Sequence, residues 1–438
     1  MSITLVELPY RDNLTATAFK FKDENLVILD SPNTPHPDGR WSILAADPIA
    51  SLNLNSNTSE QLESFKKRTQ DLVAQLDHSS LERRYEHLPF TCGVIGVASY
   101  DLGITEPGIN IKLSNKNKHP KAISHLFAWC YLWDHHEKIA YLVMYESHSR
   151  RTTSQLIDIY KTAPLATEQT INISEFKKHW DYMSYENAFN KTKNYIENGD
   201  VYQINLAQKY SADYSGEPLK AYEKLRERAA APFSIYWSSD QWSLVSSSPE
   251  RFIKIQNNSV ETKPIKGTRP NTGSGDNISQ LTNSCKDKAE NLMIVDLLRN
   301  DISKHCTNVT VPKLFDIETY PTVHHMVSTI QGKLHEKSTN LDVFWDAFPG
   351  GSITGAPKKR AMEIIDELED GGRSFYCGSV FYQSTNGHFD SNILIRSFIF
   401  KDHKVETWAG GGIVADSTVE DEYQECEDKI RKLMDWLK

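Results

Sequence analysis

Two pairs of acidic residues are spaced so that each pair would lie on one face of a helix. Asp287 and Glu290 are three residues apart in one predicted helix, and Glu422 and Glu425 are three apart in another. Residues at this spacing are neighbours on a helix surface. If the two faces met, their oxygen atoms would suit Mg²⁺, which prefers hard ligands and retains waters. Acidic residues in a first helical turn more often only complement the helix dipole, so spacing alone leaves both interpretations open.

A glycine-rich segment, Gly350-Gly-Ser-Ile-Thr-Gly-Ala-Pro-Lys-Lys-Arg360, runs into a predicted helix N-terminus. Free backbone N–H groups and the helix dipole at such a place favour an anion. The segment lacks the Gly-Lys-Ser/Thr ending of a P-loop, so a nucleotide is not predicted, and a plain tight loop is an equal alternative. A second segment, Trp408-Ala-Gly-Gly-Gly-Ile-Val-Ala-Asp-Ser417, could also bring backbone close to a ligand.

A carboxylic acid and an amine occur in two neighbouring segments. Glu250 belongs to the segment 247–252, and Lys266 belongs to the segment 263–270. Together they would supply a general acid and a nucleophile for a displacement reaction. A lysine is nucleophilic only when neutral, which requires burial or a nearby cation such as Arg269. Most lysines are solvated charges, so these residues alone do not define a reaction.

The elements that position these residues are predicted from hydrophobic periodicity and helix-end signals. Strands are predicted for residues 26–29, 41–44, 93–100, 139–145 and 201–206. Helices are predicted for residues 185–196 and 285–301, for a segment from 356–357 to 371–372, and from the capping box Ser417-Thr-Val-Glu420 onward. The pattern predicts an α+β fold with large, mostly antiparallel sheets and helices outside. Residues 53–76 are polar and partly helical in pattern, 103–120 are predicted to be an exposed loop, and 150–178 a connector with one short helix.

Two of the helices have predicted apolar stripes. In the helix 285–301 the stripe consists of Leu292, Val295 and Leu298. In the last helix it consists of Tyr423, Cys426, Ile430, Leu433 and Leu437.

The composition excludes several classes of protein. The chain of 438 residues has a formal net charge of −9, which argues against nucleic-acid binding because phosphates need a basic face. Its six cysteines include no Cys-x-x-Cys pair, so neither a disulfide framework nor a zinc finger is predicted. No apolar run reaches the roughly 20 residues that cross a bilayer, and the start lacks a secretory signal pattern. We therefore expect a soluble, cytoplasmic protein.

Further motifs follow one another between residues 180 and 435. They are Gly199-Asp-Val-Tyr-Gln-Ile-Asn-Leu-Ala-Gln, Ser248-Pro-Glu-Arg-Phe, Pro264-Ile-Lys-Gly-Thr-Arg-Pro, Val295-Asp-Leu-Leu-Arg-Asn-Asp, Val323-His-His-Met-Val-Ser, Gly355-Ala-Pro-Lys, Ile395-Arg-Ser and Gly410-Gly-Gly-Ile-Val-Ala-Asp-Ser. In this order they resemble the chorismate-utilising enzymes. The resemblance implies a sandwich-like core of the anthranilate synthase component I type. It also implies an N-terminal region over residues 1–160 and a chorismate-binding catalytic region over 161–438, which share one core.

Two positions discriminate among the members of this family. Members that add water to chorismate resemble one another in having a lysine base where this chain has Gln203, so amination is implied here. Anthranilate synthases usually have alanine at the position of Lys266, whereas lysine is typical of the members that form aminodeoxychorismate. The alternative is an anthranilate synthase large subunit, which would release pyruvate and a fluorescent product.

The resemblance implies a mechanism for an aminating transferase. Mg²⁺ would clamp the ring carboxylate through Glu290 and Glu425, with Asp287 and Glu422 in support. Glu250 would protonate the departing 4-hydroxyl while Lys266 attacks the ring at C2. Ammonia would then add at C4 and expel the lysine, giving 4-amino-4-deoxychorismate for 4-aminobenzoate and folate biosynthesis.

The resemblance also implies which residues contact the substrate. The substrate carboxylates would be held by Tyr376, Arg396, Gly410 and Gly412, aided by Gly267, Thr268, Thr354 and Gln203. His325 matches a histidine near the reacting ring, which assists pyruvate loss in the anthranilate-forming members. Two departures stand out: Asn271 where a second arginine is frequent, which could weaken anion attraction, and Phe381 where glycine is frequent, which could narrow the edge of the site.

Two further ligands are implied. None of the cysteines lies in the Gly-x-Cys-x-Gly setting of a glutaminase, so a separate glutamine amidotransferase subunit would supply ammonia. A tryptophan pocket in the N-terminal sheet would involve Ser31, Asp38, Gly39, Arg40, Trp41, Pro232, Phe233 and Ser234, although ordinary loop and core roles suit these residues equally well.

Two other classes of function are alternatives to the enzyme. A catalytically silent tryptophan-sensing module would not need Glu250, Lys266, Glu290 and Glu425 intact. A Schiff-base or pyridoxal enzyme would need a cofactor-phosphate site, and none accompanies Lys266 in the sequence.

Overall fold

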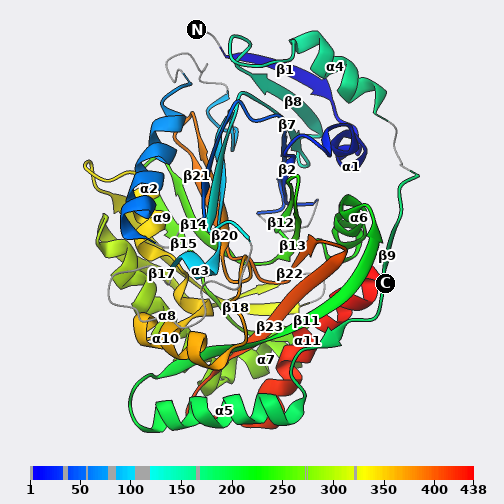
Figure 1. Cartoon of the computed structure of the whole chain (residues 1–438). Coiled ribbons are helices and arrows are strands. Elements are labelled where there is room, and N and C mark those ends of the chain that lie inside the picture. The colour runs from blue at the N-terminus through cyan, green and yellow to red at the C-terminus, as the bar shows by residue number, and fades with distance from the viewer. Residues whose placement is uncertain are drawn as a thin grey trace.

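The computed structural model describes residues 3–32, 38–55, 58–76, 85–103, 119–163, 168–271, 273, 275–319 and 323–438. Two large sheets face each other and helices line the outside (Figure 1). Every strand pairing within these described ranges is antiparallel. The predicted α+β fold is therefore confirmed. The predicted loop 103–120 lies almost entirely outside the described residues.

The first sheet has 13 strands drawn from both ends of the chain. Its order is β1 (Thr4–Pro9), β8 (Ile139–Met144), β7 (Trp129–Asp134), β3 (Trp41–Ala45), β2 (Val27–Asp30), β12 (Phe233–Ser238), β13 (Ser243–Ser248), β22 (Ser397–Lys401), β23 (Lys404–Ile413), β11 (Gln203–Gly216) and β10 (Lys177–Lys178). Two short strands, β9 (Ile171–Ile173) and β19 (Gly355–Ala356), also pair with β11.

The second sheet has 10 strands and carries much of the candidate site. Its order is β16 (Ile265–Pro270), β18 (Val323–Leu334), β15 (Ser259–Thr262), β14 (Arg251–Gln256), β21 (Phe389–Asn392), β20 (Ser379–Ser384), β5 (Gly93–Ala98), β6 (Ala122–Phe127) and β4 (Ala50–Leu54), and β17 (Cys306–Thr319) pairs with β18.

The helices cover the outer surfaces of the sheets (Figure 1). They are α1 (Leu14–Ala18), α2 (Ser59–Val73), α3 (Tyr100–Gly103), α4 (Thr153–Thr162), α5 (Tyr182–Glu197), α6 (Pro218–Ala229), α7 (Asp276–Asn283), α8 (Cys285–Ser303), α9 (Asn340–Ala347), α10 (Lys358–Leu368) and α11 (Val419–Leu437), with 3-10 turns η1 (Phe19–Phe21) and η3 (Gly351–Ile353). Helix α11 packs on β23 and α6, and α8 packs on β17 and β18. No helix in the described ranges is long and apolar enough to cross a membrane.

Aromatic and aliphatic strand residues fill the space between the layers. Strand β7 reads Trp-Cys-Tyr-Leu-Trp-Asp, and all of its residues are buried, as expected for a strand covered on both faces. The hydrophobic core forms one cluster that includes residues from β2, β7, β12, β20 and α11. Residues from the first 160 positions and from the later part of the chain therefore pack together.

The predicted helix stripes are only partly correct. In α8 the buried positions include Val295 and Leu298, but Leu292 is 46% exposed. Three-residue steps fall short of a full helical turn, so the stripe drifts, and Ile294 and Asn291 occupy the buried face instead. In α11 the prediction holds for Cys426, Ile430, Leu433 and Leu437, which are buried. Tyr423 is half-buried.

Two predicted helix ends are also wrong in detail. Thr418, and not Ser417, caps α11, because its side chain accepts from the Asp421 N–H, which leaves Ser417 to bond Glu422. Helix α10 begins at Lys358 after the extended cap Pro357 and ends at Leu368, three residues before the predicted glycines. Ala356 cannot join the helix because it pairs with β11, and a residue before proline favours extended backbone.

Candidate active site

Lys266 lies at a β-bulge in β16, facing α8 and the turn η3. Its side chain is 12% exposed, and Nζ lies 4.0 Å from Glu290 Oε2. The same Nζ donates to the Ser352 carbonyl at 3.5 Å. The bulge falls between Lys266 and Thr268, where Gly267 has a φ of +77° that only glycine adopts easily. A side chain at Gly267 would also meet the Asp287 carboxylate, at 2.9 Å from its Cγ.

Glu250 lies between β13 and β14 and is 6% exposed. Ser352 Oγ donates to Glu250 Oε1 at 2.9 Å. Burial raises the pKa of Glu250 to about 7, although the Ser352 hydroxyl, the Lys266 charge and the Ile265 backbone oppose this shift. A carboxyl group with this pKa holds its proton near neutral pH, as a general acid requires.

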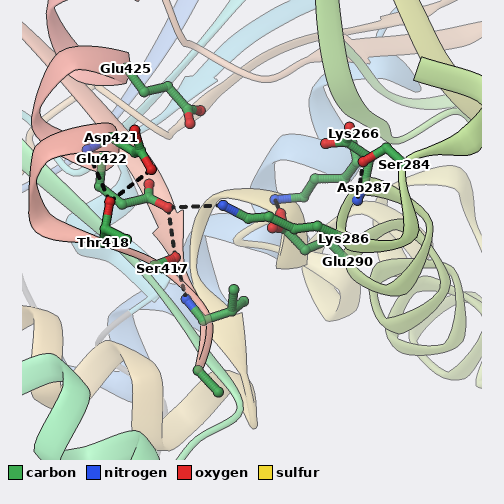
Figure 2. Close-up of polar contacts among 12 residues, drawn as sticks. Lys266, Ser284, Lys286, Asp287, Glu290, Ser417, Thr418, Asp421, Glu422 and Glu425 are labelled. Carbon is green, nitrogen blue, oxygen red and sulfur yellow. Dashed lines mark hydrogen bonds and ion pairs between the residues drawn. The ribbon is translucent and has the colours of Figure 1, made fainter. Parts of the chain in front are cut away.

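Glu290 on α8 faces the pair Glu422 and Glu425 on α11 across the gap between the two helices (Figure 2). Glu422 and Glu425 point from α11 toward Glu290 and Lys286 on α8. Lys286 Nζ lies 3.3 Å from Glu422 Oε1. Glu425 pairs with Lys429 at 2.6 Å. The negative charges of Glu422 and Glu425 are therefore each paired with the positive charge of a lysine.

The pKa values of these acids reflect their shared position. Burial raises the pKa of Glu290, and the negative charges of Glu422 and Glu425 raise it further, against the lowering effect of Lys266 and Lys286. Burial acts in the same direction on Glu425, but the Lys429 ion pair outweighs it and leaves the pKa of Glu425 below its usual value. Glu290, Glu422 and Glu425 are therefore close enough to influence one another, and Lys266, Lys286 and Lys429 oppose their negative charge.

The fourth acid has a different partner. Asp287 accepts from Arg269 Nη2 at 2.9 Å, so the arginine that could have served as the cation beside Lys266 is itself paired with a carboxylate. The Asp287 N–H donates to the capping hydroxyl of Ser284 at 3.2 Å. Asp287 therefore supports the start of α8 and the bulge at Gly267.

One observation favours a cation at the acidic pairs. Glu422 Oε2 is buried and has no hydrogen-bond partner, which is costly unless a ligand supplies one. Oxygen ligands of this kind suit Mg²⁺. Within the described residues no three acidic, histidine or cysteine side chains are already arranged around one point as a metal site.

Three consecutive glycines let β23 pass the site without side chains. A Cβ at Gly410 would meet the Leu206 carbonyl at 2.6 Å, one at Gly411 would meet Glu422 Oε2 at 2.7 Å, and one at Gly412 would meet Gln203 Nε2 at 2.5 Å. The Gly412 position also lies 3.5 Å from Lys266 Nζ. This backbone therefore passes close to the side chains of Gln203, Glu422 and Lys266, and its approach to a ligand stays a prediction.

Two polar side chains of the predicted site, Gln203 and Arg396, have no protein partner in the described part of the chain. Both amide atoms of Gln203 are buried without a hydrogen-bond partner. Arg396 has left-handed backbone, with a φ of +54°, and burial lowers the pKa of its guanidinium while the Glu250 carboxylate opposes this. In the part of the chain that the structure describes, this guanidinium has no hydrogen-bond or ion-pair partner. A partly buried guanidinium without a protein partner is suited to an anionic substrate.

The other expected contact residues surround the same region. Tyr376 is buried and stacks on Trp408, with 6.1 Å between the rings. The Thr354 hydroxyl donates to the Gly350 carbonyl at 3.0 Å and so shapes the turn η3. Thr268 Oγ1 and His325 Nδ1 are hydrogen-bonded at 2.8 Å across β16 and β18, so His325 lies opposite Thr268, and Met326 is the residue opposite Lys266.

The expected N-terminal pocket is present as a cavity of ≈ 400 Å³. Seven of the predicted residues line it: Ser31, Asp38, Arg40, Trp41, Pro232, Phe233 and Ser234; Gly39 does not. Phe381 lines it too and stacks on Phe389, 6.0 Å between ring centres. The expectation that Phe381 narrows the catalytic site is therefore wrong, because its ring lies in the aromatic core opposite Gly96. The Asn271 side chain has a local structural contact, because its Oδ1 accepts a hydrogen bond from the Gly273 N–H.

Comparisons with known proteins agree with this geometry. Residues 24–435 match the model of a family described as chorismate binding enzyme. The chain therefore belongs to the chorismate binding enzyme family. Aminodeoxychorismate synthase component 1 of Escherichia coli (strain K12) is 38% identical over 424 residues, which cover 94% of this chain and 93% of that protein.

Other relatives carry a different name on the same scaffold. Anthranilate synthase component 1 of Lactococcus lactis subsp. lactis (strain IL1403) is 31% identical and covers 95% of each chain. The crystal structure of anthranilate synthase component I from Streptococcus pneumoniae TIGR4 has a TM-score of 0.81 at 26% identity, over 90% of this chain and 92% of that one. The predicted family and fold are confirmed.

Sequence reasoning missed three residues of the site. Ser352 contacts both Glu250 and Lys266, whereas Lys286 and Lys429 balance the carboxylates. Ser352 belongs to the glycine-rich segment 350–360, but nothing in that segment indicates that it bonds a residue 102 positions away. Lys286 directly precedes Asp287, and Lys429 follows Glu425 by one helical turn, so helix spacing could have identified them.

Proposed function

We propose that the chain aminates chorismate with ammonia to 4-amino-4-deoxychorismate through a covalent adduct on Lys266. The observation that carries this proposal is the placement of Lys266 Nζ, buried and 3.5 Å from the carbonyl of a residue that also bonds Glu250. A nucleophile and a general acid are thus held beside the same turn. The relatives named aminodeoxychorismate synthase component 1 support the same activity.

The proposed reaction has two displacement steps. In the first, the neutral Lys266 amine forms a bond to C2 of the ring, the ring double bond shifts, and the C4–O bond breaks as Glu250 gives its proton to the hydroxyl, which leaves as water. In the second, ammonia forms a bond to C4, and the C2–N bond to Lys266 breaks. A proton released from the incoming nitrogen restores the enzyme. The enolpyruvyl group is retained.

We propose that Mg²⁺ binds between α8 and α11, held by Glu290 and Glu425 with Glu422 and Asp287 nearby. The mutually repelling acids and the unpartnered Glu422 Oε2 support this assignment. A bound Mg²⁺ would supply positive charge for the ring carboxylate of the substrate. The unpaired Arg396 guanidinium would bind a second carboxylate, and the Gln203 amide would hydrogen-bond the substrate beside Gly412.

Ammonia would come from a separate glutamine amidotransferase subunit, since "component 1" in the relatives' name denotes one part of a larger enzyme. At neutral pH ammonia is mostly protonated and unreactive, so delivery of NH₃ into the site is an advantage. The product would feed 4-aminobenzoate and folate biosynthesis.

The proposal is tested by incubating the chain with chorismate, Mg²⁺ and ammonium and analysing the product by mass spectrometry. We expect 4-amino-4-deoxychorismate with its enolpyruvyl group intact. Anthranilate together with free pyruvate would instead identify an anthranilate synthase large subunit. The 31% identical relative from Lactococcus lactis, named anthranilate synthase component 1, supports this alternative.

A specific observation favours a second ligand, tryptophan, in the N-terminal cavity. The cavity of ≈ 400 Å³ combines the Trp41 and Phe233 rings with Ser31 and the charged side chains of Asp38 and Arg251. An amino acid with an aromatic side chain matches apolar walls and paired charges. Calorimetric titration with tryptophan tests this, and phenylalanine serves as the comparison.

A further inference from the structure

Ser352 contacts both reacting groups of the proposed mechanism. Its hydroxyl donates to Glu250 Oε1 at 2.9 Å, and its carbonyl accepts from Lys266 Nζ at 3.5 Å. Glu250 lies in the connection between β13 and β14, and Lys266 lies in β16, so their side chains reach Ser352 from separate segments. One residue of the turn η3 therefore links the general acid to the nucleophile.

The turn that carries Ser352 is itself held on both sides. The Thr354 hydroxyl donates to the Gly350 and Gly351 carbonyls at 3.0 and 3.3 Å. The carbonyl of Ile353, directly after Ser352, accepts from Asn205 Nδ2 at 2.8 Å and from Arg373 Nη1 at 2.9 Å. Both donors are buried, so the position of Ser352 is set by the core.

We propose that Ser352 is a positioning residue for the reaction, whose hydroxyl orients the Glu250 carboxyl and whose carbonyl orients the Lys266 amine. This inference rests on the proposed function for the roles of the two groups. The proposal gives the glycine-rich segment 350–360 a role other than anion binding. The segment brings a serine to the point where acid and nucleophile meet.

The hydrogen bond has a predictable effect on acid catalysis. An ionised carboxylate accepts a stronger hydrogen bond than a protonated one, so the Ser352 hydroxyl stabilises the charged form of Glu250 and lowers its pKa. Burial alone would push the pKa higher. Ser352 thus keeps the pKa of Glu250 near neutral pH, where a general acid can both give up and regain its proton.

The test is the pH dependence of chorismate consumption by Ser352→Ala, compared with wild type and with Ser352→Thr, which keeps the hydroxyl. Activity requires protonated Glu250 and falls as pH rises through its pKa. Removing the Ser352 hydroxyl raises the pKa of Glu250, so the basic limb of the kcat–pH profile should shift to higher pH by about one unit. We also expect kcat to fall about tenfold to a hundredfold while KM changes little, because misplacement acts on the chemical step.

Two comparisons separate this role from a general loosening of the turn. Ser352→Thr should restore the wild-type limb. Thr354→Val removes a hydroxyl from the same turn that bonds only the turn's own carbonyls, and should slow the reaction without moving the limb. If Ser352→Ala does not fold, Ser352→Cys, with a weak donor of similar size, should give an intermediate shift.

A limb that stays at its wild-type position in Ser352→Ala and Ser352→Cys would overturn the proposal, whatever the loss of rate. Because chorismate consumption is measured, this outcome is independent of which product forms. Product identification decides the proposed function separately: anthranilate from the wild type would reject amination at C4, whereas the comparison of limbs would still stand.

Discussion

Lys266 Nζ lies 4.0 Å from Glu290 Oε2, so the proposed nucleophile is ion-paired with a proposed metal ligand in the free protein. The proposed Mg²⁺ would compete with Lys266 for this carboxylate. Nζ also donates to the Ser352 carbonyl at 3.5 Å, which would keep the amine at the site when its pair with Glu290 is broken.

The first prediction concerns Lys266. Replacing it with alanine should abolish a chorismate-derived adduct on the protein, because Lys266 is the amine that contacts Ser352 beside Glu250, while the far-UV circular dichroism stays unchanged. Intact-mass spectra after acid quench of wild type and Lys266→Ala measure this. Some turnover toward anthranilate can persist, since ammonia could attack C2 directly. An adduct of equal yield on the alanine variant would contradict the covalent step.

The second prediction concerns pH. Because the pKa of Glu250 is raised to about 7, kcat should fall as pH rises above about 7, as the acid loses its proton. Glu250→Gln should remove most activity at all pH values. It should also stabilise the fold at pH 8 more than at pH 5. A buried acid with a raised pKa contributes stability below its unfolded pKa and loses it as pH passes the folded pKa, here by up to roughly 3 kcal/mol.

Thermal unfolding of wild type and Glu250→Gln across this pH range provides the measurement. An equal difference in Tm at pH 5 and pH 8 would show that Glu250 titrates near its ordinary value.

The third prediction concerns the metal. Glu290→Gln and Glu425→Gln should each weaken Mg²⁺ binding by at least about tenfold, because the site has few protein ligands and each contributes a full charge. Isothermal titration with Mg²⁺ in the absence of chorismate measures this without relying on turnover. Asp296→Asn on the exposed surface of α8 serves as the matched control. Wild-type affinity in both Gln variants would mean that these acids only complement lysines and helix ends.

The fourth prediction concerns a buried ion pair beneath the site. Arg373 is buried and bonds both Glu369, at 2.6 Å, and the Ile353 carbonyl of the turn η3. Glu369→Gln leaves the guanidinium charge uncompensated and removes a charged acceptor for the Ala207 N–H, so it should destabilise the fold by about 3–5 kcal/mol. Asp296→Asn breaks an exposed pair with Arg299 and should cost less than about 1 kcal/mol. Urea unfolding of both variants measures the difference.

The sequence was sufficient for the fold class, the family and the residues of the site that occur in ordered motifs. Glu250, Lys266, Glu290 and Glu425 lie in one region because each belongs to, or directly adjoins, a helix or strand of the two sheets' layers; their catalytic and metal-binding roles stay predictions. Leu292 was misplaced because three-residue steps approximate a helical stripe over only one turn. Ser352 was missed because its role depends on a contact between positions 102 residues apart, which no local pattern encodes. The Arg269–Asp287 pair was missed for the same reason.

The last prediction concerns the partner. The purified chain should use ammonium salts but not glutamine, and adding a glutamine amidotransferase subunit should confer glutamine use. Within the described residues, five of the six cysteines are buried, and Cys285, the exposed one, precedes Lys286 at the start of α8 without a neighbouring histidine hydrogen bond to activate it. Such a cysteine is not an activated nucleophile for glutamine hydrolysis. The expectation is tested by measuring product formation with ammonium and with glutamine, each before and after the amidotransferase subunit is added. Cys285→Ser is the matched control and should change neither activity. Sustained glutamine-dependent turnover by the rigorously purified chain, lost in Cys285→Ser, would instead place a glutaminase in this chain.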